Sequence, residues 1–152
     1  MQGYIEQTSR FNLPYLPDSA KAFDVVKVYE FLKRNAVPLS SRILDMGAYQ
    51  SATLWGLHNL GFQNLYGIDL NLQIYDLPYS TEIHYRYADM IATHFPSDSF
   101  DVCMALSSIE HTPTRLNRFL TEAARITRPG GLLIITTDFA FEKVSTRSVR
   151  LL

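Results

Sequence analysis

The stretch Arg42-Ile-Leu-Asp-Met-Gly-Ala-Tyr-Gln-Ser51, followed by Gly67-Ile-Asp-Leu-Asn71, decides the fold class of this chain. The apolar residues before Asp45 indicate a buried strand that ends in a tight turn at Gly47. Asp69 closes a second apolar run, 22 residues after that glycine. An acidic residue at about this distance from a strand–glycine turn is typical of sites that hold a ribose diol. The glycine lets the backbone approach the ligand, and the carboxylate accepts from two hydroxyls. The sequence therefore predicts a site for an adenosine-containing small molecule.

Strand and helix patterns alternate along most of the chain. Strands are expected at residues 42–45, 64–69, 83–87, 100–106 and 132–137, and helices at 18–34, 51–60 and from Pro113 to the Arg128-Pro-Gly-Gly131 stop. In the last helix we expect a buried stripe of Leu116, Phe119, Leu120 and Ala123. This alternation predicts an α/β fold with a doubly wound, mainly parallel sheet and helices on both faces.

The length of 152 residues predicts one domain over residues 18–152. The aromatic and proline-rich residues 1–17 are expected to form an extended N-terminal arm or lid. Only 15 residues follow Thr137, whereas another strand–helix–strand unit needs about 30. The edge of the sheet is therefore expected to be exposed, and a homodimer through that edge is an expected form of association.

Composition excludes several classes of function. The net charge of −1 argues against bulk nucleic-acid or membrane binding, and no run is long enough to span a bilayer. The single cysteine, Cys103, lies in an apolar run, which indicates a buried structural thiol and excludes a disulfide framework. No histidine pair has a third ligand at metal-binding spacing, so no metal site is expected. The expected location is the cytoplasm.

Six motifs in order along residues 20–140 carry a resemblance to a known family: Ile-Leu-Asp-Met-Gly, Tyr-Gly-Ile-Asp-Leu, Tyr-Ala-Asp-Met, Phe-Pro-Ser-Asp-Ser-Phe-Asp-Val, Ser-Ile-Glu-His and Arg-Pro-Gly-Gly-Leu-Leu-Ile. Together they resemble the class I S-adenosylmethionine-dependent methyltransferases. The resemblance implies a Rossmann-like sheet whose usual C-terminal strands are missing here. It also implies S-adenosylmethionine as cofactor and methyl transfer to a small-molecule nucleophile as the reaction.

The resemblance assigns roles by position. The turn that cradles the methionine part of the cofactor is expected to be formed by Asp45, Gly47 and Ala48. Asp69 is expected to hold the ribose hydroxyls beside Leu70, and Asp89 the adenine amino group with Met90 against the ring. Ser107 is expected near the methionine moiety. His111 is the candidate general base, although it is equally suited to satisfying backbone groups at the start of a helix; Glu110 could orient it or pair with an arginine.

The turn after the first strand departs from the family pattern, because Tyr49 and Ser51 replace glycines. These two residues and the early C-terminus support an alternative: a shortened, non-catalytic methyltransferase-like binding or interaction module. A nicotinamide-dependent oxidoreductase is a third interpretation, against which the missing Gly-x-Gly-x-x-Gly motif argues. A solvated helix face is the expected role of four arginines: Arg115, Arg118, Arg125 and Arg128.

Overall fold

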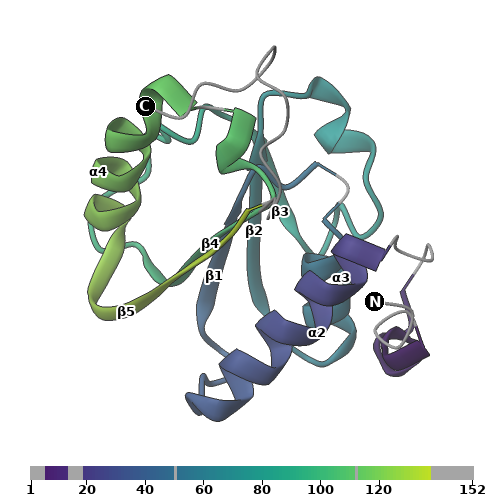
Figure 1. Ribbon diagram of the computed structural model, residues 1–152. Coiled ribbons are helices and arrows are strands. Elements are labelled where there is room, and N and C mark those ends of the chain that lie inside the picture. The colour runs from purple at the N-terminus through teal and green to yellow at the C-terminus, as the bar shows by residue number, and fades with distance from the viewer. Residues whose placement is uncertain (1–5, 14–18, 50, 112, 138–152) are drawn as a thin grey trace, which may run out of the picture.

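Five parallel strands form one sheet in the order β3-β2-β1-β4-β5 (Figure 1). The structure is a computed structural model that describes residues 6–13, 19–49, 51–111 and 113–137. The strands are β1 (Arg42–Met46), β2 (Asn64–Asp69), β3 (His84–Tyr87), β4 (Phe100–Leu106) and β5 (Thr127–Thr136). The doubly wound parallel sheet expected from the sequence is confirmed.

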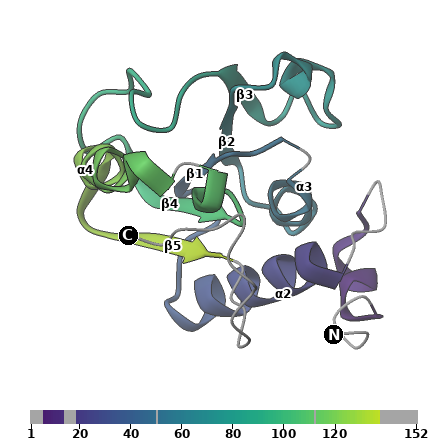
Figure 2. The ribbon, with the colours of Figure 1, turned by 45° about the horizontal axis from the view of Figure 1, so that its top comes forward.

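Helices cover both faces of the sheet, as Figure 2 shows. On one face lie α2 (Ser19–Arg34) and α3 (Ala52–Asn59), and on the other lies α4 (Leu116–Ile126). Four short 3-10 helices complete the described elements: η1 (Thr8–Phe11), η2 (Leu72–Asp76), η3 (Ile109–His111) and η4 (Pro113–Arg115). Among the described residues, no helix is long and apolar enough to cross a membrane.

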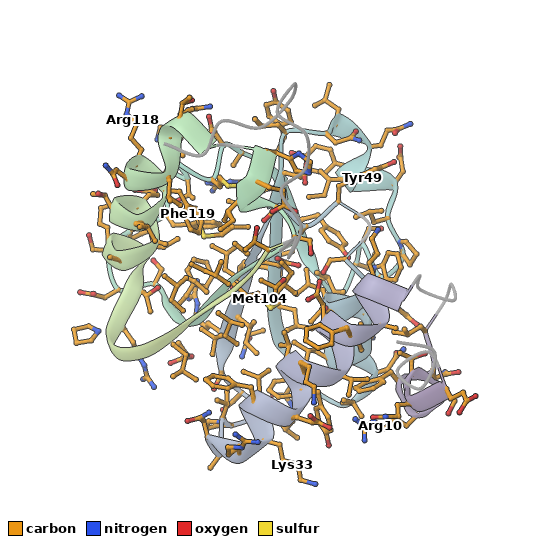
Figure 3. The ribbon with its side chains drawn as sticks, in the orientation of Figure 1. Arg10, Lys33, Tyr49, Met104, Arg118 and Phe119 are labelled. Carbon is orange, nitrogen blue, oxygen red and sulfur yellow. The ribbon has the colours of Figure 1, made fainter. Side chains whose placement is uncertain are left out.

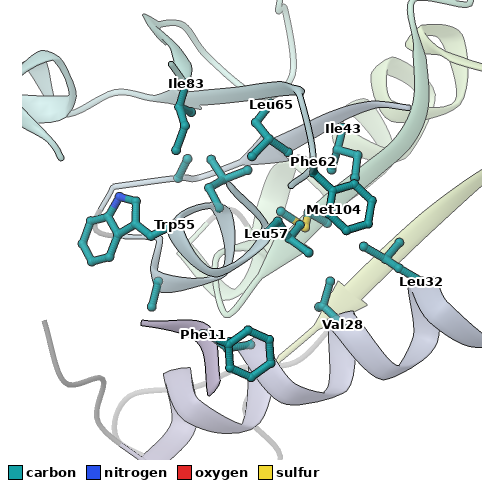
Figure 4. Close-up of a cluster of buried hydrophobic side chains, with 14 of the residues drawn as sticks. Phe11, Val28, Leu32, Ile43, Trp55, Leu57, Phe62, Leu65, Ile83 and Met104 are labelled. Atoms are coloured by element: carbon teal, nitrogen blue, oxygen red, sulfur yellow. The ribbon is translucent and has the colours of Figure 1, made fainter. Parts of the chain in front are cut away.

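The alternation of side chains along the strands gives the sheet two apolar layers. Ile43 and Met104 pack toward α2 and α3, whereas Leu44 and Cys103 pack toward α4. Figure 4 shows the first of these layers, and Figure 3 shows Phe119 pointing from α4 toward the sheet. Cys103 is fully buried, and burial raises the pKa of its thiol to about 11, which agrees with a structural role.

The N-terminal segment contributes to the first layer. Phe11 is fully buried and packs edge-to-face on Tyr29, at a ring-centroid distance of 5.5 Å. The Asn59 side chain donates to the carbonyls of Phe11 (3.0 Å) and Asn12 (2.7 Å). Thr8–Phe11 is thus a 3-10 helix and not the extended arm expected for residues 1–17; residues 1–5 and 14–17 of that arm lie outside the described residues.

The buried stripe expected for α4 is confirmed at Phe119 and Ala123 and is wrong at Leu116 and Leu120. The fully buried side chains of the helix are Phe119, Ala123 and Ile126, while Leu116 and Leu120 are each 39% exposed. On the same face of the sheet, Leu133 and Ile135 of β5 are also partly exposed. In the described part of the chain, this end of the face has no covering helix, so the apolar stripe of α4 is wider than the surface that it can bury.

The Arg128-Pro-Gly-Gly131 segment, expected to end the helix, is instead a bulge inside β5, because α4 already ends at Ile126. Thr127 pairs with Phe100 and Leu132 pairs with Val102, so four residues of β5 face a single residue of β4. Gly130 takes a positive φ of 76° within the bulge. A Pro-Gly-Gly sequence is a turn signal, but the bulge accommodates it without ending the pairing.

Candidate functional site

Gly47, Asp69 and Asp89, all predicted to bind the cofactor, meet at the carboxyl edge of the sheet. Met46 is paired with Ile68 and Asp69 with Tyr87, so β1, β2 and β3 end close together. The amides of Gly47 and Ala48 donate to the Ile68 carbonyl at 2.8 and 2.9 Å. The amide of Ala88 donates to the Asp69 carbonyl at 3.0 Å. Open parallel sheets bind their ligands at this edge.

Gly47 lies in a space that admits no larger residue. Its φ is +99°, and a Cβ atom added there would lie 2.6 Å from Cβ of Ser108 and 3.4 Å from Cε of Met90. Ser108 is held in place because its hydroxyl donates to the Met46 carbonyl at 3.0 Å. The glycine is therefore required both for its backbone angle and for the close approach of two neighbouring side chains.

Asp45 is a buried carboxyl group whose second oxygen has no partner among the described residues. It is 1% exposed, its Oδ2 accepts from the Ser51 hydroxyl at 2.5 Å, and its Oδ1 is buried and unsatisfied. Burial, and to a lesser degree the Asp24 and Asp69 carboxylates, raise the pKa of Asp45 to about 7. Folding therefore favours the protonated form. The stabilisation this form provides is complete below pH 4 and is lost as the pH rises through 7.

Ser51 explains one departure from the glycine-rich pattern. Its Oγ donates to Asp45 and accepts from the Leu54 amide at 3.4 Å, so it caps α3. A glycine at this position could provide neither contact.

A cavity of about 40 Å³ lies beside Asp45 and Gly47. Its wall includes Tyr49 and two residues of α2, Lys21 and Asp24. Asp24 is 6% exposed and accepts from the Ser107 hydroxyl at 3.5 Å. The predicted site did not include these α2 residues. The sequence did contain a signal for Asp24. This residue lies one helical turn before Val28 on the buried stripe of the helix, and a carboxylate buried there needs polar neighbours.

Asp69 is fixed by backbone groups on both sides. Its Oδ2 accepts from the Tyr49 amide at 3.0 Å and its Oδ1 from the Asn71 amide at 2.8 Å. Leu70 follows it with 54% exposure. Tyr49 forms part of the cavity wall, and its hydroxyl donates to the Gln73 side chain of η2 at 2.9 Å.

Asp89 is likewise held by two donors. Its Oδ1 accepts from the Ile91 amide at 3.1 Å, and its Oδ2 accepts from Nη2 of Arg115 at 2.7 Å. Met90 extends from the next position to Gly47. Arg115 is thus an ion-pair partner and not part of a solvated helix face.

The connection after β4 carries the remaining predicted residues. Ser107 has a positive φ of 47°, and its amide donates to the Thr136 carbonyl and hydroxyl, each at 3.1 Å. His111 is exposed at the end of η3, and its amide donates to the Ser108 carbonyl at 3.2 Å. Glu110 has a buried Oε2 without a hydrogen-bond partner in the described part of the chain, and no hydrogen bond joins it to His111 there. The role of His111 as a base stays a prediction.

Within residues 6–13, 19–49, 51–111 and 113–137, no three His, Cys, Asp or Glu side chains are grouped so that they could hold a metal ion.

Comparison with known proteins gives the family. Residues 44–135 match the methyltransferase domain family. The chain is 37% identical over 65 residues to 27-O-demethylrifamycin SV methyltransferase of Amycolatopsis mediterranei. The aligned residues cover 43% of this chain and 24% of that enzyme. The fold is similar to that of MccD (TM-score 0.66, 17% identity, 80% of this chain and 56% of that one). It is also similar to PH0226 of Pyrococcus horikoshii (TM-score 0.61, 20% identity, 78% and 60%). The chain thus spans between about a quarter and three-fifths of these proteins. Because this family match covers more than half of its length, the chain belongs to the methyltransferase domain family.

Proposed function

We propose that this domain binds S-adenosylmethionine and transfers its methyl group to an oxygen, nitrogen or carbon nucleophile on a small molecule. Membership of the methyltransferase domain family supports the reaction type. The observation that carries the choice of cofactor is the charged cavity at the end of β1, where buried Asp45 has an oxygen without a partner in the described residues and Asp24 and Lys21 lie in the same wall.

This cavity is suited to a ligand group that carries an ammonium and not to a dinucleotide. A buried carboxylate with an unused lone pair is stabilised by an ammonium or sulfonium group. A pyrophosphate needs free backbone amides at the turn, whereas the amides of Gly47 and Ala48 already donate to Ile68. The same geometry therefore argues against the nicotinamide-dependent alternative.

Each part of the cofactor has a candidate partner. Asp45, Asp24 and Lys21 would hold the amino-acid end, Asp69 the ribose, and Asp89 with Met90 and Leu70 the adenine.

The cofactor supplies a methyl group on a sulfonium leaving group. The protein's main task is then to align donor and acceptor, which can contribute about 7–11 kcal/mol. His111, on the connection after β4, is the proposed base for an acceptor that must lose a proton. The acceptor molecule, a homodimer through the sheet edge and a cytoplasmic location remain predictions.

Calorimetric titration with S-adenosylhomocysteine, the demethylated cofactor, tests this proposal. We expect micromolar binding of this ligand, binding at least about tenfold weaker of 5′-methylthioadenosine, which lacks the amino-acid end, and no binding of NAD. No binding of S-adenosylhomocysteine at millimolar concentration would favour the non-catalytic module. Binding of NAD alone would favour the oxidoreductase.

The pKa of Asp45 predicts how this affinity depends on pH. A ligand ammonium requires the ionised carboxylate, and with a pKa of about 7 most of Asp45 is protonated at pH 6. We expect affinity for S-adenosylhomocysteine to rise about tenfold from pH 6 to pH 8, with release of a proton on binding. Calorimetry in buffers of different ionisation enthalpy measures that proton. An Asp45→Asn variant should lose the pH dependence, and a flat profile in the unmodified protein would contradict the assignment.

A further inference from the structure

Arg115 and Asp89 form an ion pair between two separate segments of the carboxyl edge. Asp89 follows β3 and Arg115 follows β4, and β2 and β1 lie between these strands in the sheet. The two side chains are 27% and 40% exposed, so the pair contributes little to folding stability. The pair does connect the Asp89 carboxylate to the segment that follows β4.

The backbone around Asp89 is fixed without Arg115. The Ala92 amide donates to the Asp89 carbonyl at 3.0 Å. Further along the loop, the amide and hydroxyl of Thr93 donate to Glu122 of α4 at 2.8 and 2.6 Å. The hydrogen bond from Arg125 is the main reason why the pKa of Glu122 falls to about 2, so this anchor persists as a carboxylate over the working pH range. Loss of Arg115 would therefore release the carboxylate of Asp89 while its loop stays in place.

An ionised carboxylate can only accept hydrogen bonds, and the two donors use part of that capacity. An ionised carboxylate has about four lone-pair sites, and the Ile91 amide and the Arg115 guanidinium each occupy one. The remaining sites can accept from an amino group and repel a carbonyl oxygen. A guanidinium on one oxygen and a backbone amide on the other also define the plane in which those sites lie.

We propose that Arg115 is a positioning residue that orients Asp89 toward the 6-amino group of adenine and thereby sets a preference for 6-aminopurine over 6-oxopurine ligands. The proposal rests on the proposed function, because it concerns the adenine end of the same cofactor site.

The test compares S-adenosylhomocysteine with S-inosylhomocysteine, its 6-oxo counterpart, by calorimetry. We expect the unmodified protein to favour the adenosyl ligand at least about tenfold, and Arg115→Ala to reduce this ratio to about twofold. Arg115→Lys keeps one charged donor and should recover part of the ratio. Arg118→Ala is the matched control, since Arg118 is an exposed arginine one turn further on that points away from the sheet (Figure 3). Thermal unfolding should place all variants within about 3 °C of the unmodified protein.

The possible outcomes separate the two proposals. If the unmodified protein binds neither ligand, the proposed function fails and the role of Arg115 fails with it. If it binds S-adenosylhomocysteine but Arg115→Ala keeps the full ratio, only the role of Arg115 is wrong. Tighter binding of S-adenosylhomocysteine by Arg115→Ala would also contradict it, because Arg115 would then be competing with adenine for Asp89.

Discussion

Replacement of Asp69 by alanine is expected to weaken S-adenosylhomocysteine binding by roughly 10²–10⁴-fold, because two hydrogen bonds from the ribose hydroxyls to a charged group are lost. Each carboxylate oxygen of Asp69 already accepts one backbone amide, from Tyr49 or Asn71, and has a second lone pair for a hydroxyl. Calorimetry gives the affinity. Circular dichroism should show an unchanged fold, since the carboxylate lies at a partly exposed strand end.

Asp76→Ala is the matched control for this variant. Asp76 is an exposed carboxylate at the end of the neighbouring η2, so its loss changes the net charge equally without touching the turn after β1. The 2′-deoxy form of the ligand provides a second comparison. In the unmodified protein it should bind more weakly than S-adenosylhomocysteine, whereas in Asp69→Ala the two ligands should have similar affinities. Equal affinity of Asp69→Ala and Asp76→Ala would remove the ribose assignment.

The sheet was predictable because its strands leave strong local signals. The apolar runs that end at Asp45 and Asp69 are short, bounded and rich in branched side chains, and parallel pairing buries both of their faces. Once the order of strands and helices is known, the ends of β1, β2 and β3 must meet at one edge. The grouping of Gly47, Asp69 and Asp89 followed from that topology.

The wrong expectations concern contacts that local sequence does not encode. The width of the apolar stripe on α4 shows that Leu116 and Leu120 can be buried, but which residues become buried depends on the surface opposite the helix. The bulge at Gly130 depends on pairing with β4, which lies more than 20 residues earlier.

The electrostatics of the site was also hidden from the sequence. In the sequence, Ser51 is a departure from a glycine pattern. In the structure, its hydroxyl is the donor that holds the Asp45 carboxyl group. Asp24 is contributed by a helix that the motifs do not include. Burial raises the pKa of Asp45 most, Asp24 raises it further and the Ser51 hydrogen bond lowers it, so this pKa is a property of the assembled fold.

Gly47→Ala is expected to destabilise the domain by roughly 2–5 kcal/mol, because a positive φ disfavours alanine and the added Cβ overlaps Ser108. The corresponding fall in Tm is roughly 10 °C for a domain of this size. Gly130→Ala separates the two causes. Gly130 also has a positive φ, of 76°, but no atom lies within 4 Å of the added Cβ, so its replacement should cost only about 1–2 kcal/mol.

A double variant identifies the contact itself. Combining Gly47→Ala with Ser108→Gly removes both atoms of Ser108 that the new Cβ would meet, at 2.6 and 2.9 Å. Relative to Ser108→Gly alone, the alanine should then cost about as much as it does at Gly130, which is a coupling of at least about 1 kcal/mol in a double-mutant cycle. If Gly47→Ala is no more destabilising than Gly130→Ala, the backbone angle alone requires the glycine. The close approach of Ser108 and Met90 would then not be a constraint on the turn after β1.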